Sequence, residues 1–310
     1  KIIKNIFAHH LPWFLDRCVE DQQYLEYWEF WANKGYHIVP NHFYQPIPDT
    51  KSLKDSLWEK QSRLFGIDMN EQNQLNLIEN VFPMYREEYI FRKSKSKTPY
   101  EFYLNNGFFE SIDAQVLHCS IRHFRPSKII EVGSGFSTYI SSRACILNQQ
   151  KDGVSTELYT IEPYPNSTLR KGFPGLSRLI EKPLEQLDID FFLDLGCNDI
   201  LFVDSSHVVK TGSDVSYLFL EILPRLKAGV FIHFHDIFLP AEYPKEWIMM
   251  KQRFFNEQYF LQAFLCFNTA FEVTWASHYM YIRYKDRLKS LFEFDDSDWI
   301  GPGSFWIRKK

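Results

Sequence analysis

The sequence predicts an α/β protein with a parallel sheet. The two observations that indicate it are the alternation of short apolar runs with helix-length segments and the apolar character of each run along its whole length. Five short runs rich in Ile, Val, Leu and Phe alternate with helix-length segments between residues 128 and 234. Strands that are apolar along their whole length are buried on both faces, which is typical of parallel sheets covered by helices. Two more strand-like runs follow a probable helix, Asn256–Asn268. The seven expected strands are Lys128–Val132, Leu158–Ile161, Leu176–Ile180, Ile200–Val203, Val230–Phe234, Phe271–Ala276 and Ser304–Arg308.

Composition excludes several classes of protein. The 310 residues carry a net charge of −4, and 17% of them are aromatic. Without a basic excess, binding to nucleic acid through phosphate contacts is not expected. The aromatic content argues against intrinsic disorder. The longest apolar stretches, Tyr217–Leu223 and Gly229–Ile232, fall far short of the roughly 20 residues of a membrane span.

Cysteine usage and the start of the chain bear on the compartment. The five cysteines are odd in number and form no C-x-x-C pair, which argues against a disulfide framework and against the usual structural zinc site. No segment has the basic-then-apolar pattern of a signal peptide. A cytoplasmic protein is therefore expected. Residues upstream of Lys1 are expected to be missing, because the chain does not begin with methionine, and a homo-oligomer is compatible with the sequence.

A short basic run predicts the domain boundary. Arg92–Pro99 is polar, basic and ends in proline, as linkers often do. We therefore expect a mainly helical, aromatic cap region over residues 1–98 and a second domain over residues 99–310. In the cap region, Asp21–Asn33 carries aromatic residues at spacings of three and four, which predicts a helix. The prolines of Pro40–Asp49 predict an extended loop that presents His42 and Tyr44, either to a ligand or to packing neighbours.

The turn after the first strand has the glycines of a ligand-binding loop. Glu131 lies in the strand, and Gly133 and Gly135 follow it. Two glycines one residue apart allow a tight turn and a close backbone approach to a ligand. No Gly-Lys-Ser/Thr follows, so a phosphate-binding loop is disfavoured. Thr138 stands where the dinucleotide fingerprint G-x-G-x-x-G needs its third glycine.

A carboxylate follows the second strand. Glu162 lies 31 residues after Glu131. An acid at this strand tip can accept hydrogen bonds from both hydroxyls of a ribose in nucleoside-binding α/β sheets. This pattern indicates a ligand that contains adenosine and needs no phosphate site.

Acids and histidines follow the fourth and fifth strands. Asp204 and His207 come after one, and His235 and Asp236 come at the end of the other. Ligands bind outside the carboxyl ends of parallel strands, so these groups should gather at one edge. His233 shares a face with His235 but precedes the strand end, so we expect it to be buried and structural.

Taken together, the motifs become recognisable. IIEVGSGFST, YTIEP, ILFVDSSH and the C-terminal strand pair resemble the class I S-adenosylmethionine-dependent methyltransferases over roughly residues 100–310. The chain looks most similar to bacterial O-methyltransferases that modify sugars and other small molecules in biosynthetic pathways. The resemblance implies a Rossmann-like sheet of order 3-2-1-4-5-7-6 with the last strand antiparallel, S-adenosyl-L-methionine as cofactor and a small-molecule acceptor as partner.

The resemblance also implies roles for single residues. Glu131, Gly133 and Gly135 would border the methionine part of the cofactor, Glu162 would hold the ribose, and Asp204 would lie beside the sulfonium. Ser137 stands where many members have a third glycine. The remaining residues assigned to the cofactor are Ser137 and Thr138 at its carboxylate, Pro163, Leu184 and Glu185 at the adenine, and Ser205 after strand four.

Two chemical routes to methyl transfer stay open. An alcohol needs a base, and histidine titrates near working pH, so His207 and His235 are candidate bases, with Asp236 orienting one of them. In the metal-assisted alternative, Asp204, His235 and Asp236 are the candidate ligands of a divalent ion. Ile237 stands where the catechol-type relatives have an asparagine ligand, and the histidines suit a transition metal better than magnesium.

Two other functions compete with this hypothesis. One is a non-catalytic module that binds S-adenosylmethionine or a nucleoside, which would not need histidines at the strand ends. The other is an NAD-dependent sugar-modifying enzyme, whose complete glycine signature is not found in this sequence.

Overall fold

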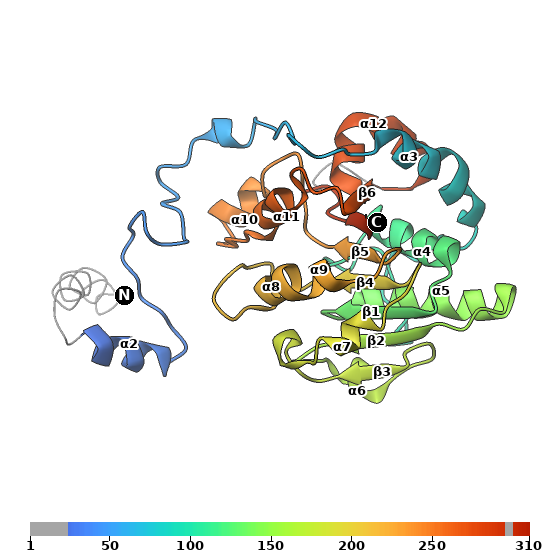
Figure 1. The fold of residues 1–310 in the computed structure, drawn as a ribbon, viewed down its shortest axis with the longest axis horizontal. Helices are drawn as coiled ribbons and strands as arrows, with labels where there is room; N and C mark the ends of the chain where they lie inside the picture. Colours follow the sequence, from blue (N-terminus) through green and yellow to red (C-terminus); the bar gives the residue numbers. More distant parts are fainter. Residues whose placement is uncertain (1–23, 295–299) are drawn as a thin grey trace. The chain divides into compact units, whose positions relative to one another are not determined.

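The computed structural model describes residues 24–294 and 300–310 (Figure 1). The chain divides into two compact units, Lys1–Leu53 and Lys54–Lys310. The domain boundary expected after residue 98 stays a prediction.

The first unit contains one described helix, α2 (Tyr24–Ala32). It falls within the helix predicted for Asp21–Asn33, of which Asp21–Gln23 lie outside the described residues. The chain after it has no regular structure across Pro40–Asp49, as the prolines predict. The described part of residues 1–98 is less helical than expected, because this irregular stretch is long and the later helical segments are short.

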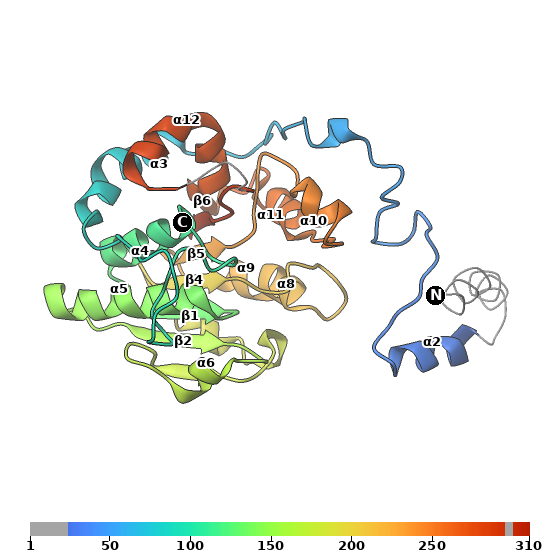
Figure 2. The ribbon, with the colours of Figure 1, turned by 180° about the vertical axis from the view of Figure 1, so that it is seen from behind.

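The second unit is built on one seven-stranded sheet of order β3-β2-β1-β4-β5-β7-β6 (Figures 1 and 2). Strand β7 is antiparallel to both β5 and β6, and the other neighbours are parallel. The predicted fold class and strand order are confirmed. The strands are β1 (Lys128–Val132), β2 (Glu157–Ile161), β3 (Arg178–Ile180), β4 (Ile200–Val203), β5 (Phe231–Phe234), β6 (Phe271–Ala276) and β7 (Phe305–Lys309).

Strand β3 begins two residues later than the sequence predicts. The amide of Leu176 donates to the carbonyl of Phe173 at 3.2 Å and so closes a turn. Pairing with β2 therefore starts only after this turn, with the amide of Ser177 on the carbonyl of Leu158 at 2.9 Å.

Helices cover both faces of the sheet (Figures 1 and 2). From β1 the chain passes through α5 to β2 on one side, and from β4 through α8 and α9 to β5 on the other. Right-handed crossovers that run in opposite directions place their helices on opposite faces. The helices of this unit are α3 (Glu71–Asn76), α4 (Asp113–Phe124), α5 (Phe136–Asp152), α6 (Ser167–Lys171), α7 (Asp190–Leu193), α8 (Asp214–Tyr217), α9 (Leu223–Arg225), α10 (Lys245–Met249), α11 (Glu257–Leu265) and α12 (Ser277–Leu291).

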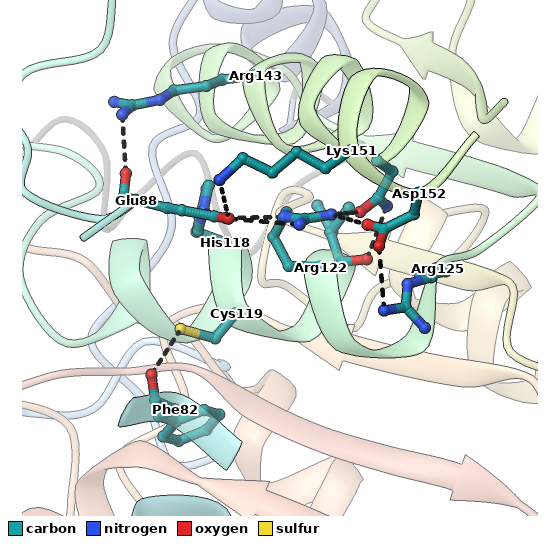
Figure 3. Close-up of polar contacts among 11 residues, drawn as sticks. Phe82, Glu88, His118, Cys119, Arg122, Arg125, Arg143, Lys151 and Asp152 are labelled. Carbon is teal, nitrogen blue, oxygen red and sulfur yellow. Dashed lines mark hydrogen bonds and ion pairs between the residues drawn. The ribbon is translucent and has the colours of Figure 1, made fainter. Parts of the chain in front are cut away.

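A carboxylate outside the sheet joins α4 to α5 (Figure 3). Glu88 accepts hydrogen bonds from Arg122 Nε at 2.7 Å and Lys151 Nζ at 2.9 Å, and its Oε2 lies 3.1 Å from His118 Nε2. Arg122 also bonds Asp152 at 2.6 Å. Burial alone would raise the pKa of Glu88, but the hydrogen bonds from His118, Arg122 and Lys151 outweigh it and hold this pKa well below its ordinary value.

We expect Glu88→Gln to destabilise the protein by about 2 kcal/mol near neutral pH, because it removes one of the two carboxylates that pair with the buried Arg122. The free energy of unfolding in urea measures this loss. Glu87→Gln is the matched control: Glu87 is exposed, and its substitution should change stability by less than about 0.5 kcal/mol.

The same pair of variants gives a pH test. The pKa of Glu88 is depressed by folding, so its stabilisation is present above the unfolded pKa of about 4.3 and is lost as pH falls through the folded value. The stability difference between the parent and Glu88→Gln should therefore stay constant from about pH 7 to about pH 5 and shrink as pH falls further. A difference that grew on acidification would contradict the assigned direction.

Candidate functional site

The turn after β1 requires a glycine. Gly133 has φ of +78°, and a Cβ on it would lie 1.8 Å from the backbone oxygen of Asp204. The amide of Asp204 donates to the carbonyl of Val132 at 2.8 Å, and the amide of Gly133 to that of Ile161 at 2.9 Å. The tips of β1, β2 and β4 are thereby held together, and only a residue without a side chain fits between them.

Glu131 lies beneath this turn and is fully buried. Burial raises its pKa to about 8, although hydrogen bonds from Ser137 and Thr138 oppose the shift. The hydroxyl of Ser137 donates to Glu131 Oε1, whereas Glu131 Oε2 has no hydrogen-bond partner within the described part of the chain. Thr138 Oγ1 accepts from the amide of Gly135 at 3.0 Å. These residues support the loop from below.

Glu162, at the tip of β2, is held by the backbone. Its Oε1 accepts from the amide of Tyr164 at 2.8 Å, and its Oε2 lies 3.3 Å from the amide of Ser134. Two amide donors fix the carboxylate beside the glycine turn while it stays partly exposed. It can therefore accept further hydrogen bonds from a ligand.

These strand tips border a cleft of about 480 Å³, hereafter the β1–β4 cleft. Seven of the residues assigned to the cofactor from sequence line it, whereas Glu131, Gly135, Ser137 and Thr138 do not. The seven are Gly133, Glu162, Pro163, Leu184, Glu185, Asp204 and Ser205.

Sequence reasoning missed the far wall of this cleft. Ser206, Lys210 and Asp214 line it, in the loop from β4 to α8. Asp214 accepts hydrogen bonds from the amide and hydroxyl of Ser206 at 2.9 and 2.6 Å, and Ser213 caps α8 by accepting from the amide of Ser216. A Gly-Ser-Asp sequence at 212–214 is a recognisable helix start and could have pointed to this wall.

Three side chains at the ends of β4 and β5 converge on one point. His207 Nε2 lies 3.2 Å from Asp204 Oδ1 and 3.5 Å from Asp236 Oδ2. One potential ligand atom from each residue can be chosen so that all lie within 4.8 Å of one another. Two carboxylate oxygens and one imidazole nitrogen at this spacing could hold a divalent metal ion.

Glu257 holds the other side of the imidazole. Its Oε2 lies 2.9 Å from His207 Nδ1, and the amides of Asn256 and Glu257 donate to the carbonyl of His207 at 3.1 and 3.2 Å. Burial opposes protonation of His207, but the hydrogen bonds to Asp204 and Glu257 outweigh it and raise its pKa well above the ordinary value. The ring is thus oriented from both nitrogens. Nothing in the sequence pointed to Glu257.

His233 is buried inside the sheet, as predicted. Its ring stacks on Phe202 with centroids 4.0 Å apart, and its Nε2 lies 2.9 Å from the hydroxyl of Ser304. Burial lowers the pKa of His233 well below the ordinary value. His235 shares its face, with ring centroids 6.0 Å apart.

His235 and Asp236 line a second cavity of about 220 Å³, hereafter the His235 cavity. The Nε2 of His235 lies 3.4 Å from Asp236 Oδ1, and its Nδ1 has no hydrogen-bond partner among the residues that the structure describes. Burial lowers the pKa of His235, but Asp236, Asp204 and Asp113 outweigh it and raise this pKa above the ordinary value. His42 and Tyr44 belong to the first unit, and their part in a site stays a prediction.

Comparison with known proteins identifies the class. A family model described as a methyltransferase domain matches residues 130–237, from β1 to just after β5. An uncharacterized protein of Archaeoglobus fulgidus is 34% identical over 182 residues, which cover 54% of this chain and 77% of that protein. A solved structure described as "CmcI-N160 apo-structure" aligns at a TM-score of 0.36 and 15% identity, over 65% of this chain and 72% of that one. The family match, together with the sheet order β3-β2-β1-β4-β5-β7-β6, identifies residues 130–237 as part of a methyltransferase domain with a Rossmann-like fold.

Within the described part of the chain, no helix combines the length and the apolar character needed to span a membrane.

Proposed function

We propose that this methyltransferase transfers a methyl group from S-adenosylmethionine to a hydroxyl of a small-molecule acceptor. The observation that supports it best is the β1–β4 cleft, which is lined by Gly133 of the glycine turn and by Glu162. The carboxylate of Glu162 accepts a hydrogen bond from the backbone amide of Tyr164. A carboxylate at the second strand tip suits the two hydroxyls of a ribose. S-adenosylmethionine would supply an electrophilic methyl group.

The residues around the cleft suit an adenosyl ligand. Leu184 and Pro163 offer apolar surface for a base, and Glu185 a polar edge. Gly133 lets the tips of β1 and β4 approach each other at the cleft, because a Cβ on it would collide with the backbone oxygen of Asp204. We place the sulfonium of S-adenosylmethionine beside Asp204, because the negative charge of this carboxylate attracts a cation.

The acceptor lies, in this proposal, in the His235 cavity. Asp204 lines the β1–β4 cleft, Asp236 lines the His235 cavity, and both approach the same nitrogen of His207. The donor and acceptor sites therefore meet at this imidazole, which suits an in-line transfer that depends on positioning. His235, whose Nδ1 has no hydrogen-bond partner in residues 24–294 and 300–310, is our candidate to accept the proton of the hydroxyl.

A divalent metal ion is compatible with the same site. Asp204, His207 and Asp236 would hold it, in place of the set with His235 expected from sequence. Glu257 supports this choice, because metal-binding histidines commonly have a carboxylate on their other ring nitrogen. The ion would lower the pKa of an acceptor hydroxyl bound to it.

Loss of the ribose contact gives the first test. Glu162→Ala should weaken binding of S-adenosylhomocysteine by about tenfold or more, because it removes hydrogen bonds to a charged acceptor. Isothermal titration measures the affinity. Glu181→Ala, which removes an exposed acid paired with Arg170, should leave it unchanged. Parental affinity in Glu162→Ala, or tighter binding of NAD than of S-adenosylhomocysteine, would refute the proposed cofactor.

The metal assignment is tested with Mn²⁺ alone. We expect the parent to bind the ion and Asp236→Asn to bind it at least about tenfold more weakly, because a carboxylate ligand is lost. Asp190→Asn is the control, since Asp190 is an exposed acid on α7. Electron paramagnetic resonance of free Mn²⁺ follows the titration. Equal affinity in the parent and Asp236→Asn would exclude this ligand set.

The proton acceptor is tested by His235→Ala. Turnover should fall by about 100-fold, the usual scale of a lost general base, while the affinity for S-adenosylhomocysteine stays close to that of the parent. The assay is release of S-adenosylhomocysteine with the best acceptor from a panel of single-ring alcohols and phenols. His123→Ala, near the C-terminal end of α4 and outside the lining of the His235 cavity, is the control. An unchanged rate in His235→Ala would place the base elsewhere.

A further inference from the structure

The loop of residues 301–304, which leads into β7, lies against the backbone of Asp236. The antiparallel register of β5 and β7 brings Gly303 of this loop opposite Asp236. The carbonyl of Gly303 accepts from the amide of Ile237 at 2.9 Å. A Cβ on Gly303 would lie 3.1 Å from Asp236 Cα and 3.2 Å from Asp236 N. The two backbones are therefore in close contact, and a side chain would fit between them only if one of them moved.

The backbone of Asp236 needs support on both sides. Its φ of +56° is in the left-handed region, which residues other than glycine rarely adopt and which persists where neighbours hold it. On the β4 side, the amide of His235 donates to the carbonyl of Val203 at 2.9 Å. On the β7 side, the corresponding hydrogen bond is the one from Ile237 to Gly303.

The carboxylate of Asp236 lies between two imidazoles. Its Oδ1 is 3.4 Å from His235 Nε2, and its Oδ2 is 3.5 Å from His207 Nε2. Because one short side chain carries both oxygens, a displacement of the Asp236 backbone changes both distances together. The position of the 301–304 loop therefore bears on the geometry of the site.

Asp113, the first residue of α4, is bonded to this loop. It is 5% exposed, and its Oδ2 and Oδ1 accept from the amides of Gly303 and Ser304 at 2.7 and 3.0 Å. The amide of Ser277 donates to the carbonyl of Ser304 at 2.8 Å. Both polar groups of Gly303 are thus bonded, its amide to Asp113 and its carbonyl to Ile237.

We infer that Asp113 is a positioning residue for Asp236, which acts through Gly303 to fix the backbone that aims the Asp236 carboxylate at His207 and His235. A carboxylate suits this role because each of its oxygens can accept from one of two neighbouring amides. The consequence for metal binding rests on the proposed function, whereas the consequence for the backbone does not.

Amide hydrogen exchange of the full chain, followed by NMR without added ligand, tests the effect on the backbone. Asp113→Asn replaces one acceptor oxygen with an amino group that cannot accept from an amide. Exchange of the Ile237 amide should then speed up by about tenfold relative to the His235 amide, the scale of one hydrogen bond. Asp113→Ser, which also removes the carboxylate, should give the same result. A parental ratio in the folded variants would overturn the inference.

Asp199→Asn is the matched control. Asp199 is 4% exposed, and it accepts from the amides of Lys128 and Gly196 at 2.8 Å each. It precedes β4, at the opposite end of this strand from the site. Its substitution should lower stability but leave the ratio of the two exchange rates at the parental value. The same change of ratio in Asp199→Asn would indicate general loosening and would also overturn the inference.

A double-mutant cycle with Mn²⁺ tests the effect on the site. Asp113→Asn should weaken Mn²⁺ binding by about tenfold, because a carboxylate ligand is misplaced. In the Asp236→Gly background it should cause no further loss, since the ligand through which Asp113 acts is already absent. Glycine also tolerates the φ of this position. An equal loss in both backgrounds would assign Asp113 a general structural role and overturn the inference.

The two measurements separate failure of this inference from failure of the proposed function. If the parent does not bind Mn²⁺ but Asp113→Asn speeds up exchange at Ile237, the metal assignment fails and the positioning role stands. If the parent binds Mn²⁺ and the exchange ratio stays parental in Asp113→Asn, the positioning role fails and the ligand set stands.

Discussion

The site depends on one close contact, between the glycine turn after β1 and the start of the loop after β4. At this place the chain order across the sheet reverses, since β1 leads to β2 on one side and β4 to β5 on the other. Such switch points open a crevice at the carboxyl ends of the strands. Gly133 approaches the carbonyl of Asp204 so closely that any side chain would force the tips apart. The β1–β4 cleft and the position of Asp204 both follow from this contact.

Burial controls the charges around this crevice. Glu131 is removed from water entirely, and its raised pKa leaves it largely neutral at pH 7 beneath the loop. His207 is also buried, but Asp204 and Glu257 hold its ring from both sides and favour its charged form. Buried groups a short distance apart therefore differ in charge state, because their partners differ. A site with acids facing one imidazole can hold either a proton or a metal ion.

The strands were predictable because their signals are local, whereas their order was implied by the resemblance to the class I methyltransferases. Continuous apolar runs identify buried strands, and the residues after them, such as Glu162 and Asp204, must lie at one edge of a parallel sheet. Contacts that depend on packing of distant segments were not predictable. Glu257 reaches His207 from 50 residues away, and Trp247 reaches the cavity from a short helix with no motif. Ser137 was assigned to the cofactor by resemblance, but here it bonds Glu131 below the loop.

The most direct test of the proposed cofactor site is a crystal structure of the protein with S-adenosylhomocysteine. We expect the ligand to occupy the β1–β4 cleft, with its ribose hydroxyls on the carboxylate of Glu162 and its sulfur towards Asp204. A ligand bound elsewhere in the molecule, or bound in this cleft with the ribose turned away from Glu162, would contradict this assignment.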